Sequence, residues 1–135
     1  MKPVSAGAGR RLVSSGGPWE ASAGYSRAVV VGDGCWVAGT TDAGSDGRSA
    51  HPRDPGAQAA ASLDIIGRAL AEAGFALEDV VRTRIFVTEA ALIPAVLAAH
   101  GARFHAIRPA ATIVVVASLI EPSLLVEIEV DARRS

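Results

Sequence analysis

Three acidic residues at alternate positions near the end of the chain are the side chains best suited to chemistry. Glu127, Glu129 and Asp131 lie within the segment 125–132, where they alternate with apolar residues. Because successive side chains of a β-strand point to opposite faces, the three carboxylates share one face of a predicted strand. Carboxylates on a strand otherwise fit for burial cost free energy unless water, a cation or a ligand meets them. This strand is therefore the first place to look for a site.

Glu127 and Glu129 allow two interpretations. As like charges roughly 7 Å apart on one strand face, they can raise each other's pKa, which suits a group that shuttles protons. Alternatively, both glutamates form ion pairs with Arg82 or Arg84 across the sheet, or with another subunit. The sequence leaves both interpretations open.

The cysteine and histidine residues do not indicate a second site. Cys35 is the single cysteine, which excludes an intrachain disulfide and suits a reducing cytosol. It lacks a nearby basic partner that would activate the thiol, so we expect a small buried hydrophobe. The histidines, His51, His100 and His105, show no metal-ligand spacing. We expect neither a metal nor another cofactor.

The size and charge of the chain fit one domain without a polyanionic partner. The 135 residues form a single predicted domain, 1–135, in which residues 1–9 are expected to be disordered or loosely attached. A net charge of −1 gives no overall attraction to nucleic acid or membrane, and Arg10-Arg11 and Arg133-Arg134 are expected to be solvated. There is no signal-peptide pattern and no apolar run of the roughly 18 residues that a membrane helix requires. We expect a cytoplasmic protein.

The first third of the chain predicts a strand and a hairpin. A short strand is expected over 10–15, followed by a turn-rich connection over 14–19 that contains Gly-Gly-Pro. Two apolar runs, 28–32 and 35–39, flank Asp33-Gly34, a dipeptide preferred in type I′ turns. The sequence therefore predicts a tight hairpin there.

A long loop and a helix follow the hairpin. The segment 40–55 is rich in Gly, Asp, Ser and Pro and predicts a surface loop, and loops of this length often contribute to a binding rim. Asp54 fits the N-cap and Pro55 the first position of a helix, which Gly74 would end.

The second half of the chain predicts strand, helix and two further strands. In the strand 79–87, Val81 lies on the face of Thr83, Ile85 and Val87, and the other face carries Arg82, Arg84 and Phe86. A helix is expected over 89–104. The segments 108–119 and 125–132 complete the order β, β, β, α, β, α, β, β. This order predicts an α+β fold, a mixed β-sheet of about six strands with two helices packed on one face.

The face of the sheet away from the helices needs a cover. Arg82, Arg84 and Phe86 together with the acidic strand are too charged for a dry core. Identical copies of the chain can cover such a face, and a closed ring is the common arrangement. We therefore expect a homo-oligomer.

Six segments of the chain carry a family resemblance over roughly residues 20–132. They are Gly24-Tyr-Ser-Arg-Ala28, which is similar to a G-P-Y-S-Q-A segment, Val37-Ala-Gly-Thr40, the helix 57–74, Val80-Val-Arg-Thr-Arg-Ile-Phe-Val87, Arg108-Pro-Ala110 and Val126-Glu-Ile-Glu129. In this order and spacing they resemble the Rid family, also called YjgF-like or L-PSP proteins.

The resemblance implies a chorismate-mutase-like subunit, a homotrimer and small-ligand clefts between subunits. It implies that Glu127 holds or activates the water that attacks an imine carbon, and that ligand contacts come from the tyrosine and from backbone amides. The ligand-contact positions fall on Tyr25, Ala38, Gly39 and Ile113.

Ala111 is the main departure from the family pattern. In the family's deaminases an arginine directly after Pro-Ala binds the substrate carboxylate, and here that position is Ala111. Losing such a contact costs about 2–5 kcal/mol of binding free energy. The resemblance thus implies an imine or enamine hydrolase for a substrate other than a typical 2-imino acid. The alternatives are a non-catalytic trimer that binds a small metabolite for regulation, and RNA cleavage, which the net charge does not favour.

Overall fold

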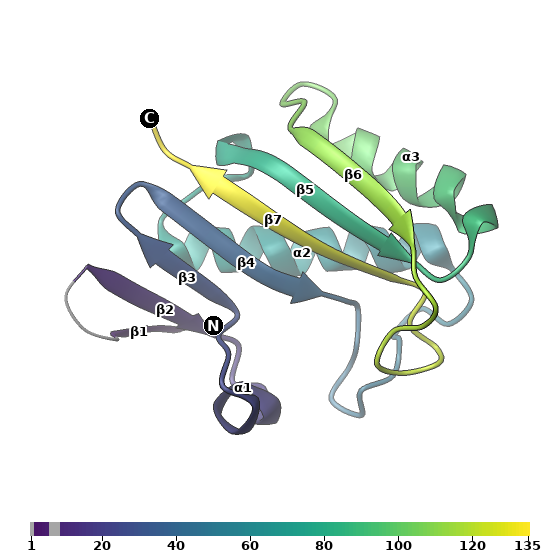
Figure 1. Ribbon diagram of the computed structural model, residues 1–135, viewed down its shortest axis with the longest axis horizontal. Helices are drawn as coiled ribbons and strands as arrows, with labels where there is room; N and C mark the ends of the chain where they lie inside the picture. The colour runs from purple at the N-terminus through teal and green to yellow at the C-terminus, as the bar shows by residue number, and fades with distance from the viewer. Residues whose placement is uncertain (1, 6–8) are drawn as a thin grey trace.

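The computed structural model describes residues 2–5 and 9–135, and it shows one mixed β-sheet with helices on one side (Figure 1). In the described residues the sheet has seven strands in the order β1-β2-β3-β4-β7-β5-β6, of which β5 and β6 are parallel and the other neighbours antiparallel. The strands are β1 (Lys2–Ser5), β2 (Arg10–Ser14), β3 (Ala28–Val31), β4 (Gly34–Thr40), β5 (Val80–Val87), β6 (Ala110–Val115) and β7 (Val126–Arg133). The predicted α+β class and mixed sheet are confirmed.

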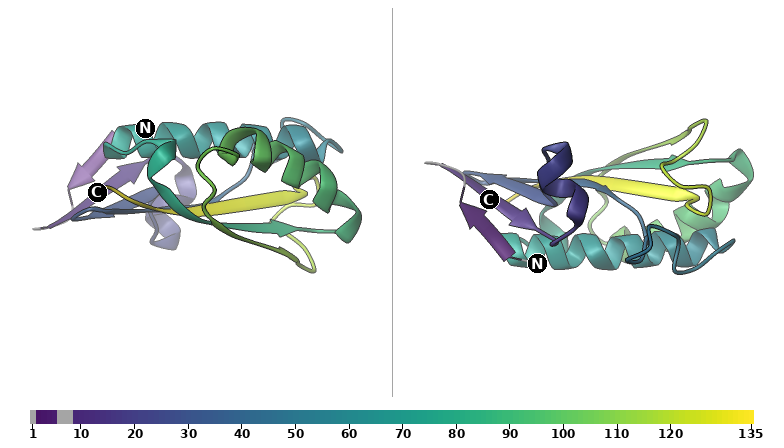
Figure 2. Two further views of the ribbon diagram at one scale, coloured as in Figure 1. Left: turned by 90° about the horizontal axis from the view of Figure 1, so that it is seen from above. Right: turned by 90° about the horizontal axis from the view of Figure 1, so that it is seen from below.

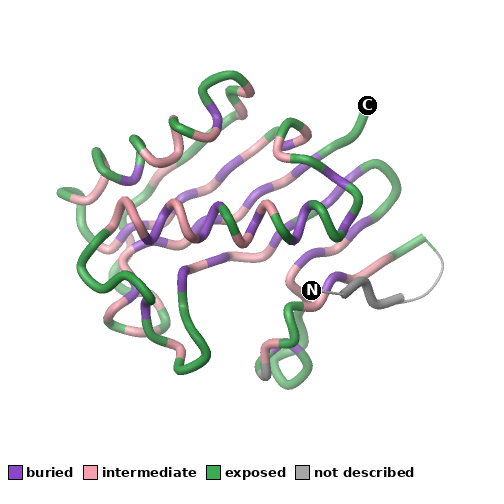
Figure 3. The backbone as a smooth tube through the Cα atoms, turned by 180° about the vertical axis from the view of Figure 1, so that it is seen from behind, coloured by how far each residue is buried: buried purple, intermediate pink, exposed green. Residues whose placement is uncertain are grey.

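Two helices, α2 (Pro55–Ala73) and α3 (Ile93–Phe104), lie against the same face of the sheet (Figure 2). Leu63, Ile66 and Leu70 recur at helical spacing in α2 and are fully buried against the strands. As Figure 3 shows from the helix side, burial alternates along the strands beneath α2. The core therefore fills the space between the helices and one face of the sheet. In the described residues no helical layer covers the other face.

Both ends of α2 are fixed by specific contacts. The Asp54 side chain accepts a hydrogen bond from the Ala57 N–H, and Gly74 ends the helix at a positive φ of 85°, as predicted. Arg11 and Arg134, which were predicted to be solvated, also donate to carbonyls at the end of α2, Arg11 to Ala73 at 2.6 Å and Arg134, which stays exposed, to Gly74 at 3.0 Å. They join both ends of the chain to one helix end.

The β3–β4 hairpin forms one residue away from the predicted turn. Val31 pairs with Gly34, so the two turn residues are Gly32 and Asp33, and Gly32 has a positive φ of 55°. A positive φ at the first turn residue alone is typical of type II′. Gly34 belongs to the strand instead, and a Cβ there would lie 2.9 Å from a ring carbon of Trp36. The missing side chain of Gly34 thus leaves room for the Trp36 ring, and the positive φ of the turn falls on Gly32.

The predicted placement of Val81 is wrong because β5 contains a β-bulge at this residue. The register shifts between Val80, which pairs with Ala132, and Arg82, which pairs with Asp131. As a result Val80 is buried and Val81 is 48% exposed. From Arg82 onward the predicted alternation of faces is confirmed.

The N-terminal part contains elements that the sequence pattern did not indicate. Within residues 1–9, expected to be loosely attached, Lys2–Ser5 instead form β1 and pair with β2, while residues 1 and 6–8 lie outside the described residues. The predicted turn 14–19 runs into a short helix, α1 (Pro18–Ala23). Its Glu20 accepts hydrogen bonds from Ser14 and Ser15, which explains why a helical turn forms there.

The remaining connections are short. One turn of 3-10 helix, η1 (Leu77–Asp79), precedes β5, and another, η2 (Ala90–Leu92), replaces the start of the helix predicted from residue 89. None of the helices in the part of the chain that the structure describes has the length and apolar character needed to cross a membrane.

Candidate functional site

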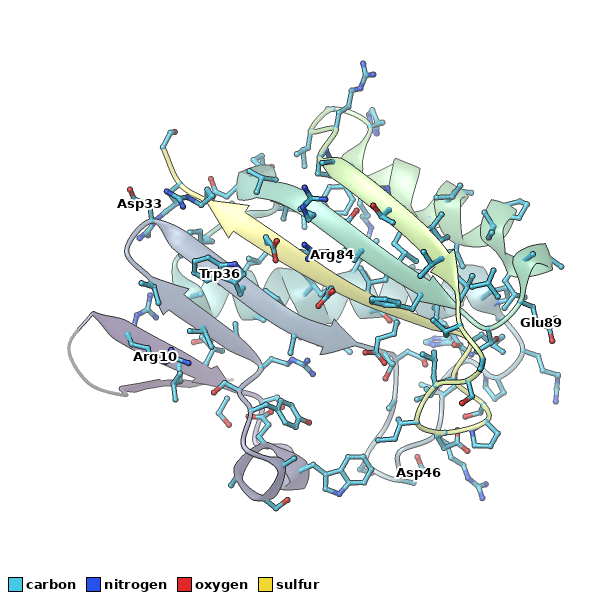
Figure 4. The ribbon with its side chains drawn as sticks, in the orientation of Figure 1. Arg10, Asp33, Trp36, Asp46, Arg84 and Glu89 are labelled. Carbon is cyan, nitrogen blue, oxygen red and sulfur yellow. The ribbon has the colours of Figure 1, made fainter. Side chains whose placement is uncertain are left out.

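The acidic strand β7 presents its carboxylates on the face of the sheet opposite the helices. Val126, Ile128, Val130 and Ala132 are buried in the core, and Glu127, Glu129 and Asp131 alternate with them at intermediate exposure. We call this second surface the open face; Figure 4 looks onto it, with Arg84 and Trp36 labelled. The predicted division of β7 between two faces is confirmed.

Arg84 forms ion pairs with two of the three acids on β7. Its Nη1 lies 3.4 Å from Asp131 Oδ2 and 3.8 Å from Glu129 Oε1. For Glu129 this confirms the interpretation as an ion pair across the sheet. Glu127 takes part in none of the ion pairs found among the described residues. Glu127 is therefore the carboxylate of this strand left for other chemistry.

Glu127 lies in a bulge of the neighbouring strand. Val37 pairs with Val130 and Thr40 with Ile128, so β4 has one extra residue here, at Ala38–Gly39. A Cβ on Gly39 would overlap the carboxylate, at 3.0 Å from Glu127 Cδ. The missing side chain of Gly39 thus gives the Glu127 carboxylate its place beside the β4 backbone.

Burial raises the pKa of Glu127 above its ordinary value, the positive charge of Arg27 opposes that rise, and Glu129 adds to it. The direction is the predicted one. Its main cause differs, because desolvation outweighs the repulsion from Glu129. A half-buried carboxyl with a raised pKa is suited to accept a proton and return it.

Arg27 is the site residue that sequence reasoning missed. It directly precedes β3, and its Nη2 donates to the Gly39 carbonyl at 2.6 Å. Burial lowers the pKa of Arg27, opposed by the nearby Tyr25, Glu20 and Glu127. The available signal was an arginine placed directly before an apolar run.

Tyr25 lies between α1 and β3 and is 44% exposed. It borders a groove of about 800 Å³ on the open face, together with Glu20, Trp36, Ala38, Arg84 and Glu129. Glu127 lies just beyond this lining, next to Ala38–Gly39. The structure therefore brings three predicted positions, Tyr25, Ala38 and Gly39, to the surroundings of Glu127.

Ala111 and Ile113, the other two predicted ligand-contact positions, lie away from Glu127 in the structure. Both are on β6, beside Thr83 and Ile85 of β5, which are buried on the helix face. Strand β5 stands between β6 and β7, and Glu127 points to the opposite face. One subunit therefore does not bring Ala111 or Ile113 together with Glu127.

The structure offers no alternative centre at the cysteine and no metal cluster in the part of the chain it describes. Cys35 is fully buried, and burial raises the pKa of its thiol to about 11, so it stays protonated at neutral pH. Among residues 2–5 and 9–135 no group of three or more histidine, cysteine, aspartate or glutamate side chains could hold a metal ion.

A buried polar network orders the loop after β4. Asp42 Oδ2 accepts from Ser49 Oγ at 2.8 Å and from His51 N–H at 3.0 Å, and lies 3.1 Å from His51 Nδ1. Gln58 of α2 donates to the carbonyls of His51 and Ser123. The long loop predicted over 40–55 is therefore tied to α2 and to the segment before β7.

Comparison with known proteins agrees with this fold. The family model described as Endoribonuclease L-PSP matches residues 17–134. The chain belongs to this L-PSP family, to which the YjgF-like proteins also belong. Its chorismate-mutase-like α+β fold is the fold of that family.

Individual relatives are similar over nearly the whole chain. An uncharacterised protein of Streptomyces coelicolor, SCO2049, is 40% identical over 124 residues, covering 92% of each chain. The crystal structure of Rv2704 from Mycobacterium tuberculosis, a member of the YjgF/YER057c/UK114 family, is 46% identical with a TM-score of 0.84, and covers 93% of this chain and 99% of that one. The Escherichia coli YjgF structure is 30% identical with a TM-score of 0.75, covering 92% and 94%.

Proposed function

We propose that the protein hydrolyses a small reactive imine, enamine or related carbonyl compound, with Glu127 as the catalytic residue. Membership of the L-PSP family supports a small-molecule role. The observation that carries the proposal is Glu127 itself, a half-buried carboxyl with a raised pKa and no ion pair among the described residues. In the reaction, water adds to the imine carbon while Glu127 accepts its proton. That proton passes to the nitrogen to give a carbinolamine, whose hydroxyl proton then moves through Glu127 to the nitrogen as the C–N bond breaks, leaving a carbonyl product and ammonia.

The substrate is one other than a typical 2-imino acid. The family resemblance assigns the carboxylate-binding arginine to position 111, where this chain has alanine. An alanine offers no hydrogen bond and no charge, and so it would bind a carboxylate there at least tenfold more weakly than arginine. Position 111 then sets which imines are accepted.

The active assembly is a cytoplasmic homotrimer with clefts between subunits. One subunit contributes Glu127, Tyr25, Ala38 and Gly39, and its neighbour contributes Ala111 and Ile113. Two observations support this arrangement: the two groups lie on different faces of one sheet, and the open face carries large exposed apolar side chains at Val31, Trp36 and Val114. An apolar face of this kind is commonly covered by a further copy.

A coupled assay tests the proposed function. An oxidase generates imines in place, from amines and from amino acids, and semicarbazide traps whatever is not hydrolysed. We expect wild type to reduce the trapped fraction for at least one imine that is not a 2-imino acid, and Ala111→Arg to gain activity on 2-imino acids. A wild-type protein that is inert on the whole panel would contradict the proposal.

Ala111 also favours a second candidate, a trimer that binds a small metabolite without turning it over. Calorimetry with a metabolite panel distinguishes the two. Binding without turnover supports the regulatory candidate, and turnover that depends on Glu127 supports the enzyme. RNA cleavage, which the family description names, is disfavoured for this chain by its net charge of −1.

A further inference from the structure

Arg27 is held rigidly at the centre of the candidate site. Its backbone N–H donates to the Val13 carbonyl at 2.9 Å, and its carbonyl accepts from the Ala38 N–H at 3.0 Å. The residue is thus fixed between β2 and β4. Its guanidinium is fixed in turn by the 2.6 Å hydrogen bond from Nη2 to the Gly39 carbonyl. A fixed guanidinium loses little conformational entropy when it binds a further partner.

Arg27 and Glu127 flank the same residue without touching. Arg27 donates to Gly39, and the Glu127 carboxylate occupies the space where a Gly39 side chain would be. The two charges influence each other, yet they are not among the ion pairs with nitrogen and oxygen within 4.0 Å. Glu127 therefore does not take up the hydrogen-bond donors of the Arg27 guanidinium.

The guanidinium has hydrogen-bonding capacity to spare. Arginine carries five N–H donors, and the Arg27 contact to Gly39 uses one of them. Its Nε is buried and has no hydrogen-bond partner in the part of the chain that the structure describes. An unsatisfied buried donor on a cation costs free energy, and a ligand carboxylate would supply both acceptors and the opposite charge.

The neighbouring acids and cations are already engaged. Glu20, which also acts on the charge of Arg27, accepts hydrogen bonds from Ser14 and Ser15 through both of its oxygens. On the open face, Arg84 is paired with Glu129 and Asp131. Arg27 is thus a cation beside Glu127 that forms no ion pair with a carboxylate among the described residues.

We propose that Arg27 binds a carboxylate of the ligand, so that the substrate class is a small imine or enamine that carries a carboxylate. This inference rests on the proposed function for its reaction, and deepens it by naming the anchoring group. The carboxylate is held beside β3, and not at the edge strand β6 where Ala111 lies. This different anchoring position is consistent with a substrate other than a typical 2-imino acid. Arg27 is then the residue that determines specificity for anions at this site.

Binding of a simple carboxylate tests this assignment without any turnover. Propionate is the probe and propionamide its neutral counterpart, and both are titrated while backbone amide shifts in the 24–40 segment are followed by NMR. We expect wild type to bind propionate and not propionamide. Arg27→Gln should weaken propionate binding by at least about tenfold, and Arg27→Lys by less, because lysine keeps the charge but loses the planar fork.

Two further variants separate this inference from the proposed function. Arg48→Gln removes an exposed arginine in the loop after β4, and it should bind propionate like wild type. Glu127→Gln removes the catalytic carboxyl and a nearby negative charge, so it should bind propionate at least as well as wild type. If propionate binding depends on Arg27 while no imine is hydrolysed, the proposed function fails and the anion site stands.

Three results would overturn the Arg27 assignment. The first is equal binding of propionate and propionamide, and the second is propionate binding that Arg27→Gln leaves unchanged. The third is a wild type that shows no amide shifts with either probe. Thermal unfolding of each variant establishes that it is folded. If Arg27→Gln does not fold, the conservative Arg27→Lys variant takes its place in the binding comparison.

Discussion

Gly39 is the single residue that makes room for the Glu127 carboxylate. A side chain at position 39 would collide with that carboxylate, which must then move away from Arg27 and the β4 backbone. We predict that Gly39→Ala destabilises the fold by about 1–3 kcal/mol and abolishes ligand binding at the site. Gly67→Ala is the control, because a Cβ on Gly67 of α2 meets nothing within 4 Å.

Urea unfolding measures both variants in parallel. Gly67→Ala should stabilise the protein by about 0.5–1 kcal/mol, since alanine favours a helix interior over glycine. If Gly39→Ala proves as stable as wild type and binds the same ligands, the close approach of Gly39 and Glu127 is not a feature of the folded protein.

The raised pKa of Glu127 predicts a pH dependence of stability. A carboxyl whose pKa is higher in the folded than in the unfolded state binds more protons when folded. Its contribution to the free energy of unfolding therefore falls as pH rises from the unfolded pKa, near 4.5, through the folded pKa. We predict that Glu127→Gln, which cannot ionise, gains stability relative to wild type between pH 4.5 and neutrality. Unfolding curves across this range measure the difference, and a gap independent of pH would contradict the assigned shift.

Single residues also show what sequence patterns can reveal of a site. The alternation in β7 is a local property, and it was enough to place Glu127 on a face away from the core. Arg27 could not be found this way, because its role depends on a hydrogen bond to Gly39 on the next strand and on the bulge beside Glu127. Side-chain contacts between strands are set by register, which periodicity within one segment does not determine.

Helix α2 is the element on which both termini converge. Arg11 of β2 and Arg134 beyond β7 donate to carbonyls at its C-terminal end, where the helix dipole also favours cations. We predict that Arg11→Met and Arg134→Met each lower the free energy of unfolding by about 1 kcal/mol. Arg133→Met, next to Arg134 and exposed, should have little effect. Equal stability of all three variants in chemical denaturation would show that these caps contribute nothing.

The Asp42 network predicts how the loop after β4 is ordered. Asp42 Oδ2 accepts from Ser49 and from the His51 backbone, and an alanine there would offer no acceptor to either donor. We predict that Asp42→Ala costs about 1–3 kcal/mol of stability and speeds amide exchange in residues 42–51. Asp46→Asn, in the exposed part of the same loop, should change neither. Exchange rates in Asp42→Ala that match wild type would contradict the network's role.

For helices and strands, the sequence predicts that an element exists better than it predicts the residues at which the element begins and ends. The N-cap at Asp54 and the stop at Gly74 were predictable because each depends on one residue and its own backbone. The hairpin turn was misplaced by one residue because Gly32, and not Asp33, takes the positive φ of the first turn position. Helix α1 was missed because Glu20 stabilises it through contacts with Ser14 and Ser15 in the preceding segment.

The part of the molecule that the structure describes has two layers, a sheet and the helices on one of its faces. Helices α2 and α3 cover one face of the sheet (Figure 2). On the open face Trp36 and Val114 are each 42% exposed. We predict that the protein is a trimer at micromolar concentration, since copies of the chain would cover this face. Light scattering coupled to size-exclusion chromatography gives the mass directly, and a monomer would remove the proposed intersubunit cleft.

Glu127 is the centre of this account, and the rate of imine hydrolysis tests it most directly. The assay compares wild type with Glu127→Gln and Glu89→Gln on the imine that wild type hydrolyses fastest. Glu89 is an exposed glutamate outside the site (Figure 4). We predict that Glu127→Gln lowers kcat by about 10²-fold or more while Glu89→Gln leaves it unchanged, because general acid–base catalysis contributes that much. A Glu127→Gln variant as fast as wild type would contradict the role of Glu127 and with it the proposed mechanism.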